Sequence, residues 1–175
     1  MKKIILAGGQ GSGKTTILNE LKKEFYCIEE ATSYLIDDGF TPEEHSFEEF
    51  QNAVIKKQKE MEQKAHGKIV FLDRCMIDTI LYLNEEGRDV PSELLEDIKN
   101  ANYTYVFFLE VLQEKYWAMP AHKKPRITTY KKGVARTKKL LDIYLSFDIP
   151  LKKIPVLPIE ERIKIIKETI NDLEW

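Results

Sequence analysis

Residues 8–16, GGQGSGKTT, are the stretch that decides the fold, and they directly follow the apolar run 4–7, IILA. Their spacing satisfies G-x-x-x-x-G-K-[ST], the pattern of a phosphate-binding loop, without a mismatch. Glycines let successive backbone N–H groups turn inward around a β-phosphate, and a helix opening at Lys14 adds the positive end of its dipole. A glycine-rich turn that binds nothing is the alternative. Because a strand precedes the loop and an amphipathic stretch follows it, we expect a nucleoside triphosphate here.

The loop positions predict different contacts with ATP and Mg²⁺, the expected cofactors. Lys14 supplies a mobile positive charge to the β- and γ-phosphates, and the hydroxyl of Thr15 faces the magnesium ion that bridges them. Asp73, discussed below, is the second expected magnesium ligand. The nucleotide-binding residues predicted from the motif are Gly9, Gly11, Ser12, Gly13, Lys14, Thr15 and Thr16.

Length and composition predict one domain over residues 1–175. The chain is 43% hydrophobic, which is enough for one sizeable core. Its net charge of −2 gives no global field for nucleic acid or a membrane surface. No apolar run is long enough for a bilayer span or a signal peptide, so we expect a cytoplasmic protein without a membrane partner. Cys27 and Cys75 lack metal-ligand spacing and are expected to be reduced core residues; the oligomeric state stays open.

Apolar strand-like runs alternate with helical patterns along the chain. This alternation predicts an α/β fold in which helices cover both faces of a five-stranded parallel sheet. Ser46 and Glu49 form a capping box that opens a helix. Three helical stripes are expected to be core faces rather than binding surfaces: Phe47, Phe50, Val54, Met61 and Ala65; Leu140, Leu141, Tyr144 and Leu145; and Ile159, Ile163, Ile166, Ile170 and Leu173. The predicted strands are Lys3–Ala7, Phe25–Ile28, Ile69–Leu72, Thr104–Leu109 and Lys153–Val156.

The residues after each strand are the place to look for chemistry, because ligands of open parallel sheets bind at the strands' carboxyl ends. Asp73 follows an apolar strand, where it could hold magnesium; capping the next helix is the alternative. Arg74 stands where a dedicated ATPase usually has a second acid that activates water. A guanidinium suits gripping a substrate phosphate or hydroxyl, which favours transfer over hydrolysis. A structural salt bridge is the other interpretation of Arg74.

Glu29 and Glu30 follow the second predicted strand. Either carboxylate could accept a proton from an acceptor hydroxyl or orient that hydroxyl toward the γ-phosphate. Two acids interacting with the dipole in the first turn of a helix are an equal alternative. The pattern does not choose between the two residues.

A basic segment after the fourth strand predicts a lid over the phosphates, from about residue 115 to 136. Arg126 and Arg136 are the candidates for stabilising charge on the transferred group. A solvated basic face is the alternative, and a nucleic-acid patch with stacking aromatic residues is disfavoured by the acidic net charge. The basic residues are Lys123, Lys124, Arg126, Lys131, Lys132, Arg136, Lys138 and Lys139, and the aromatic residues are Tyr116, Trp117 and Tyr130.

These motifs together resemble the kinase-like AAA-domain ATPases, which are akin to ribosylnicotinamide kinase, thymidylate kinase and the deoxynucleoside kinases. The resemblance is carried by the phosphate-binding loop, Glu29-Glu30-Ala31, the run 73–78 (DRCMID) with Tyr82, and the segment 144–158 that leads into Glu161-Arg162. It covers the chain from Lys3 to about Ile170.

The resemblance implies a three-layer α/β/α kinase-like fold with strand order 2-3-1-4-5, a helical substrate cover at about residues 38–67, and an arginine-bearing lid. It also implies site roles. Glu30 or Glu29 would be the base, Asp73 the metal-linked acid and Arg74 the substrate clamp. Asp78 would face the substrate, and the loop ending at Pro158 would hold the adenine ring.

Residues and resemblance together favour an enzyme that moves the γ-phosphoryl group of Mg-ATP to a small metabolite, a nucleoside or nucleotide. The alternative is a regulatory ATPase or nucleotide-dependent switch that acts through a protein partner. A GTPase is disfavoured because the chain contains neither Asn-Lys-x-Asp nor Asp-x-x-Gly. Acceptor dependence separates the two main hypotheses, because only a kinase consumes ATP faster when its acceptor is added.

Overall fold

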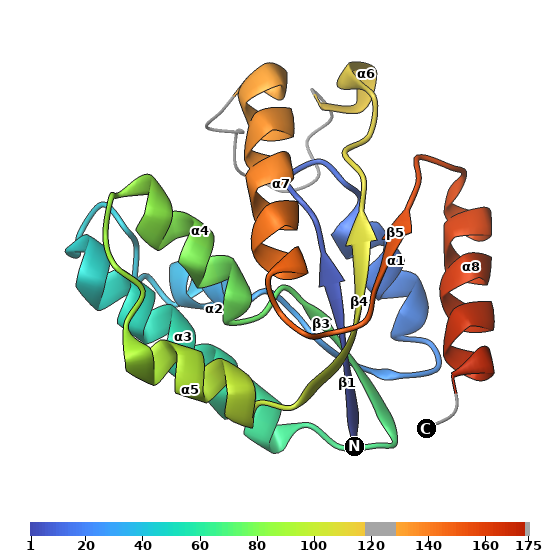
Figure 1. Ribbon diagram of the computed structural model, residues 1–175, viewed down its shortest axis with the longest axis horizontal. Coiled ribbons are helices and arrows are strands. Elements are labelled where there is room, and N and C mark those ends of the chain that lie inside the picture. The colour runs from blue at the N-terminus through green and yellow to red at the C-terminus, as the bar shows by residue number, and fades with distance from the viewer. Residues whose placement is uncertain (118–128, 174–175) are drawn as a thin grey trace.

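The computed structural model describes residues 1–117 and 129–173. Within them the chain alternates strands and helices, as the apolar pattern predicts (Figure 1). The strands are β1 (Lys2–Ala7), β2 (Tyr26–Ile28), β3 (Ile69–Asp73), β4 (Tyr103–Leu109) and β5 (Leu151–Ile154). The helices are α1 (Lys14–Leu21), α2 (Ala31–Asp37), α3 (Phe47–Lys64), α4 (Ile77–Glu85), α5 (Ser92–Asn100), α6 (Glu114–Trp117), α7 (Tyr130–Leu145) and α8 (Ile159–Asp172).

The five strands form one sheet in the order β2-β3-β1-β4-β5, with every neighbouring pair parallel. This confirms the strand order implied by the resemblance. The prediction for the last strand was shifted: β5 covers Leu151–Ile154 rather than residues 153–156. The pairing starts early because Leu151 lies beside Val106 of β4, and it ends before Pro155, which has no N–H to donate to a ladder.

Each face of the sheet has its own core, because successive strand side chains point to opposite faces. On one face, Ile5 and Ala7 of β1 pack in a cluster that includes residues of α4, α5 and α7. On the other, Ile4 and Leu6 pack with α1 and α8. Figure 1 shows α8 and α1 together on one side and the remaining long helices on the other. The predicted layers are therefore present.

The stripes only partly serve as core faces. The capping box is confirmed, since Ser46 Oγ accepts from the Glu49 amide at 3.2 Å and the Glu49 carboxylate accepts from the Ser46 amide at 3.0 Å. On α3, Phe50 is buried and Phe47, Met61 and Ala65 pack against the core, as predicted, but Phe47, Phe50 and Val54 also line a cavity.

The ends of the other two stripes also depart from the prediction. On α7, Leu140 and Tyr144 are buried, but Leu145 is 56% exposed because it lies at the end of the helix. On α8, Ile166 and Ile170 are buried, and Leu173 lies just beyond the last helical residue.

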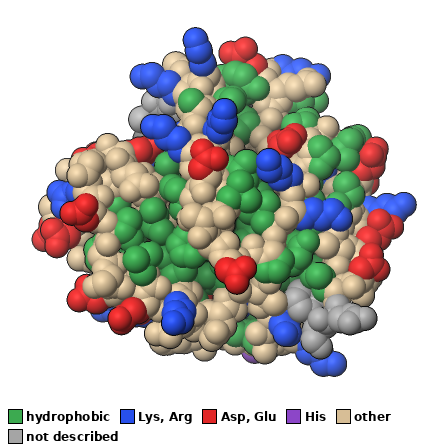
Figure 2. All heavy atoms as spheres, viewed as in Figure 1, with side chains coloured by type: hydrophobic (Ala, Val, Ile, Leu, Met, Phe, Trp, Pro, Cys, Tyr) green, Lys and Arg blue, Asp and Glu red, His purple; other side chains and the backbone are tan. Residues whose placement is uncertain are grey.

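The described helices are too short or too polar to cross a membrane. Figure 2 shows apolar side chains gathered toward the middle of one face and charged side chains mostly around its edge. Cys27 and Cys75 are both free thiols, and Cys75 is buried, as expected of a reduced core residue.

Candidate active site

The phosphate-binding loop joins β1 to α1 and holds its own lysine. Lys14 Nζ donates to the carbonyl oxygens of Gly8 at 2.8 Å and Gly9 at 3.0 Å. The side chain is only 7% exposed. Burial, together with the positive charge of Arg74, lowers the pKa of Lys14 to about 8, against the opposing attraction of Asp73. The lysine is thus poised at the loop, held by carbonyls that a phosphate oxygen could replace.

Two glycines explain why this loop needs its sequence. Gly13 caps α1 with φ of 84°, a left-handed conformation that side chains rarely adopt. A Cβ on Gly9 would lie 1.7 Å from Thr137 Oγ1 of α7, so the helix packs directly on the loop. Thr15 is half-buried and Thr16 is exposed at the start of α1. The chain therefore builds the cradle that the motif predicts.

Asp73 ends β3 beside this loop. It is 5% exposed, and burial raises its pKa while the positive charge of Lys14 opposes that rise. Its Oδ1 is buried without a hydrogen-bond partner among the described residues. Asp73 does not cap α4, which begins at Ile77 after Met76. A buried carboxylate oxygen without a partner, at the end of the strand beside the one that leads into the phosphate-binding loop, fits a magnesium ion.

Arg74 follows immediately and adopts φ of 71°, an unusual conformation for a residue other than glycine. Its Nε lies 2.9 Å from Glu30 Oε1, a charge contact without hydrogen-bond alignment, and its Nη1 donates to Asp78 Oδ1 at 2.8 Å. Burial would lower the pKa of Arg74, but the negative charge of Glu30 and other neighbours raises it well above its usual value. The guanidinium is thus held between two carboxylates, so the salt-bridge interpretation is correct for its contacts.

Asp78 anchors this group from α4. Its Oδ2 accepts from the Tyr144 hydroxyl of α7 at 2.5 Å and from the Cys75 amide at 3.2 Å. Asp78 is 4% exposed and Tyr144 1% exposed. Burial raises the pKa of Tyr144 well above its usual value, so it stays a hydroxyl donor. These contacts fix the orientation of Arg74 through Asp78.

The structure separates the two adjacent glutamates. Glu30 is the N-cap residue of α2, and its carboxylate lies beside Arg74. Glu29 forms an ion pair with Lys22, and its side chain is 47% exposed. Neither residue lies in the first helical turn, which starts at Ala31 and contains no acid. Of the two predicted bases, only Glu30 lies at the cavity described next.

A cavity of about 500 Å³ opens beside Glu30 and Arg74. This volume is within the range of small-molecule sites. α2 and α3 form one wall and α4 forms another; of these helices, α3 lies within the residues expected to form a substrate cover, about 38–67. The lining residues that bear on its chemistry are Glu30, Phe47, Phe50, Gln51, Val54, Gln58, Arg74, Asp78, Tyr82, Glu85, Glu86 and Arg136.

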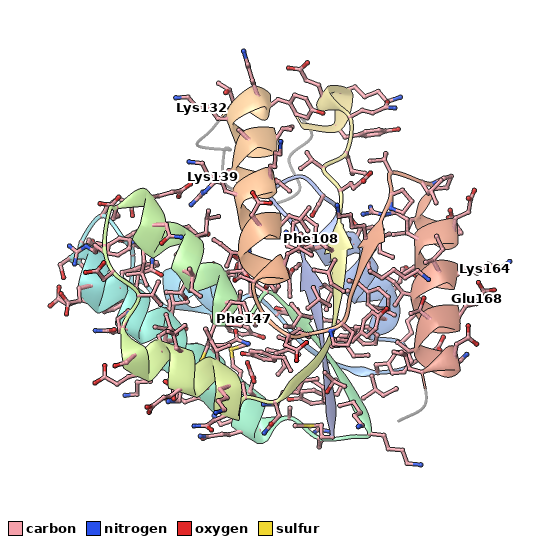
Figure 3. All side chains as sticks on the ribbon, in the orientation of Figure 1. Phe108, Lys132, Lys139, Phe147, Lys164 and Glu168 are labelled. Atoms are coloured by element: carbon pink, nitrogen blue, oxygen red, sulfur yellow. The ribbon has the colours of Figure 1, made fainter. Side chains whose placement is uncertain are left out.

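The predicted lid is only partly described. Arg126, with Lys123 and Lys124, lies outside the described residues. Arg136 of α7 lines the cavity, where its Nη2 donates to Glu85 Oε2 at 2.5 Å and its guanidinium lies 4.6 Å from the centre of the Tyr82 ring. Lys131, Lys132, Lys138 and Lys139 are exposed. Figure 3 shows Lys132 and Lys139 projecting outward from the same side of α7.

Two further residues were not among the predicted site residues. Arg162 of α8 is 2% exposed, and in the described part of the chain its Nε and Nη2 have no hydrogen-bond partner. Its Nη1 lies 3.0 Å from where a Cβ of Gly13 would be, and its amide donates to the carbonyl of Pro158. The exposed Pro158 therefore begins α8 close to the phosphate-binding loop. The signals in the sequence were its place in the Glu161-Arg162 pair of the resemblance and on an otherwise apolar helix face.

Gln58 is the second site residue that was not predicted, and the buried carboxylate of Glu62 holds its side chain in place. Its Nε2 donates to Glu62 Oε1 at 2.8 Å, and the Tyr103 hydroxyl donates to the same oxygen at 2.9 Å. Lys3 Nζ pairs with Glu62 Oε2 at 2.7 Å. The spacing of four residues predicts that Gln58 and Glu62 meet on one face of a helix. Their contacts with Lys3 of β1 and Tyr103 of β4 depend on the fold and could not be predicted.

The fold and this site together define a P-loop protein of the α/β class, with the fold and strand order of nucleotide kinases. The AAA domain family model matches residues 3–162, so the chain belongs to that family. No curated protein matches it.

Several solved kinases share the fold at low sequence identity. Deoxyadenosine kinase from M. mycoides with bound dATP superposes with a TM-score of 0.66 at 17% identity, covering 97% of this chain and 100% of that one. Thymidylate kinase from Candida albicans gives 0.63 at 16% identity, with coverage of 97% and 91%. Shikimate kinase from Aquifex aeolicus gives 0.61 at 18%, with coverage of 97% and 96%. At such identities these likenesses establish the fold alone.

Proposed function

We propose that this protein is a kinase that transfers the γ-phosphoryl group of Mg-ATP to a hydroxyl of a small metabolite, a nucleoside or nucleotide. The observation that carries the proposal is the joining of two sites. Arg74 lines the cavity, and its amide donates at 3.2 Å to the carbonyl of Leu6 in β1, the strand that leads into the phosphate-binding loop; Glu30 and Asp78 lie beside it. A donor on the loop and an acceptor in the cavity would therefore meet at these residues.

On the donor side, the loop amides and Lys14 bind the phosphates. Lys14 exchanges the carbonyls of Gly8 and Gly9 for phosphate oxygens, which costs little because it is already aimed at the loop. Magnesium, when bound by Thr15 and Asp73, would neutralise charge that develops on the phosphates. Pro158 stands beside the loop where the nucleoside part of ATP could lie.

On the acceptor side, Glu30 is the proton acceptor and Arg74 positions it. Asp78 keeps the guanidinium in place, and Arg136 is the described lid arginine that lines the cavity. Water must stay out, because an unprotected γ-phosphoryl group would be lost to hydrolysis. The half-enclosing helices α2, α3 and α4 support that exclusion. The structural neighbours act on acceptors that differ in charge, as their names state, so the fold leaves the acceptor open.

The experiment is ADP release from Mg-ATP by the purified protein, first alone and then with pooled nucleosides, nucleoside monophosphates and nicotinamide ribosides. A rise that depends on one pool supports the kinase. Slow release that no pool changes, despite tight ATP binding, would instead favour a regulatory ATPase that acts through a protein partner.

The two adjacent glutamates provide a matched pair of variants. Glu30→Gln should lower acceptor-stimulated transfer by about 10²-fold or more while ATP affinity stays close to wild type. Glu29→Gln makes the same chemical change one residue away and should leave transfer within about twofold. Equal activity in both variants would remove Glu30 from the role of base.

A further inference from the structure

We infer that the cavity takes an acceptor without a phosphate or carboxylate group, a nucleoside-like hydroxyl compound rather than a nucleoside monophosphate. The inference rests on the proposed function and names its substrate class. It is carried by the charges of the cavity lining and by how the cations there are already paired.

The described lining contains more acid than base. Two guanidinium groups face it, those of Arg74 and Arg136. The carboxylates that line it are Glu30, Asp78, Glu85 and Glu86. The described wall therefore has an excess of two negative charges. An anionic acceptor entering this space meets net repulsion, which a partly water-excluded cavity makes stronger.

Arg74 is not open to a second anion. Arg74 is held between Glu30 at 2.9 Å and Asp78 at 2.8 Å. Turning it toward a substrate phosphate would take the cation from Asp78, whose side chain is 5% exposed. Breaking a buried ion pair in this way is strongly unfavourable, because it leaves a charge without compensation.

Arg136 has one carboxylate partner and one aromatic partner. It donates to Glu85 and stacks over the ring of Tyr82. Arginines that bind phosphate usually present two parallel N–H groups to it. Glu85 takes the Nη2 group and the Tyr82 ring covers one face of this guanidinium, while its Nε has no hydrogen-bond partner among the described residues. The net negative charge of the described wall therefore carries the inference on this side of the cavity.

The rest of the wall suits a flat, uncharged molecule with hydrogen-bonding edges. Phe47, Phe50 and Tyr82 supply aromatic surface, and the amide of Gln51 supplies donors and an acceptor without charge. Gln58 is oriented by Glu62, which leaves its carbonyl oxygen and second N–H for the cavity. None of these groups would compensate a phosphate.

The test compares acceptors in matched pairs: adenosine with AMP, cytidine with CMP and thymidine with dTMP. In acceptor-stimulated ADP release, at least one nucleoside should exceed its 5′-monophosphate by about tenfold or more in kcat/KM. Calorimetry on the ADP-bound protein should show the same order in affinity. If every monophosphate equals or exceeds its nucleoside in both assays, the inference is overturned and the kinase function still stands.

A charge reversal at the cavity tests whether its negative charge causes the preference for nucleosides. Glu86 is exposed and has no role in the proposed transfer, so Glu86→Lys should fold. It should lower the ratio of kcat/KM for a nucleoside to kcat/KM for its monophosphate by about fivefold. Glu168→Lys makes the same change on α8, on the other side of the sheet, where Figure 3 shows Glu168 pointing outward. It should leave the preference unchanged. A preference that Glu86→Lys does not move would overturn the electrostatic basis.

The outcomes separate the two proposals. ADP release that no compound stimulates would count against the kinase, and the calorimetric order would still decide which class of ligand the cavity binds. Tighter binding of all monophosphates than of their nucleosides would overturn only the substrate class.

Discussion

Lys14 shows how a binding loop makes its ligand affinity depend on pH. The folded protein lowers the pKa of this lysine from 10.5 to about 8, chiefly by burial. A bound triphosphate favours the charged form, so above pH 8 binding must bring a proton with it. We expect nucleotide affinity to fall above about pH 8, approaching tenfold for each pH unit. Titration of Mg-ATP between pH 7 and 9.5 by calorimetry would measure this, with proton uptake as a second readout.

The same lysine lowers the stability of the nucleotide-free protein. Below pH 8 both the folded and the unfolded chain carry the charge, so its burial cost of about 3 kcal/mol is fully present. Between about pH 8 and 10.5 only the unfolded chain holds the proton, so stability rises with pH. Lys14→Met should bind no ATP and yet unfold at a temperature equal to or above that of the wild type at pH 7. A strongly destabilised variant would contradict this account.

Arg162 is a second buried cation whose contacts look incomplete. Burial lowers its pKa, and two of its nitrogens have no partner in the chain as described. Replacing an uncompensated buried charge by an apolar side chain of similar length is often neutral or stabilising. We expect Arg162→Met to raise the free energy of unfolding by about 1 kcal/mol without nucleotide, as measured by urea denaturation. A loss of stability would mean that the guanidinium holds Gly13 and α8 together.

The residue scale is where sequence reasoning reached its limit. The spacing of residues 8–16 predicted the phosphate cradle because its chemistry depends on local backbone. The sequence could not show which of Glu29 and Glu30 lies at the site, because that depends on their ion-pair partners. These partners are Lys22, just after α1, for Glu29 and Arg74, just after β3, for Glu30. Asp78 and Tyr144, which orient Arg74, are 66 residues apart in the chain and meet only through the packing of α4 on α7.

At the scale of elements, α7 and the phosphate-binding loop fit with no space for a methyl group at Gly9. Gly9→Ala should therefore lower both the melting temperature and ATP affinity, because Thr137 or the loop must move. Thr137→Ala removes the nearest atom and should partly restore both properties in the double variant. Thermal denaturation and calorimetry of the two single variants and the double variant give the coupling. Additive losses would show that the helix and the loop are not in contact as described.

Elements with a strong local signal were predicted well. The capping box at Ser46 placed the start of α3 correctly because both of its partners are within one turn. What α3 packs against was not predictable, since a cavity wall and a core face need the same apolar spacing. Phe50 is buried at 6% exposure and still lines the cavity. The shift of β5 has the same origin, because the partner strand β4 decides where pairing begins.

For the whole molecule, nucleotide binding should raise the free energy of unfolding. A ligand at 100 times its dissociation constant adds about 2.7 kcal/mol to a protein that binds it only when folded. For a chain of this length that corresponds to a rise of about 5–10 °C in melting temperature. Mg-ATP should produce this rise in the wild type and none in Lys14→Met. An equal rise in both would place the nucleotide elsewhere than at the loop.

The two proposed sites lie on different parts of the fold. The phosphate-binding loop joins β1 and α1 at the centre of the sheet, whereas the cavity proposed for the acceptor is walled by α2 and α3, which follow the edge strand β2. Substitutions at Phe47 or Val54 can therefore reshape the acceptor space while leaving the phosphate cradle and the central strands intact. The same phosphate-binding core can therefore be combined with different acceptor cavities, as the variety of kinases that share this fold at under 20% identity illustrates.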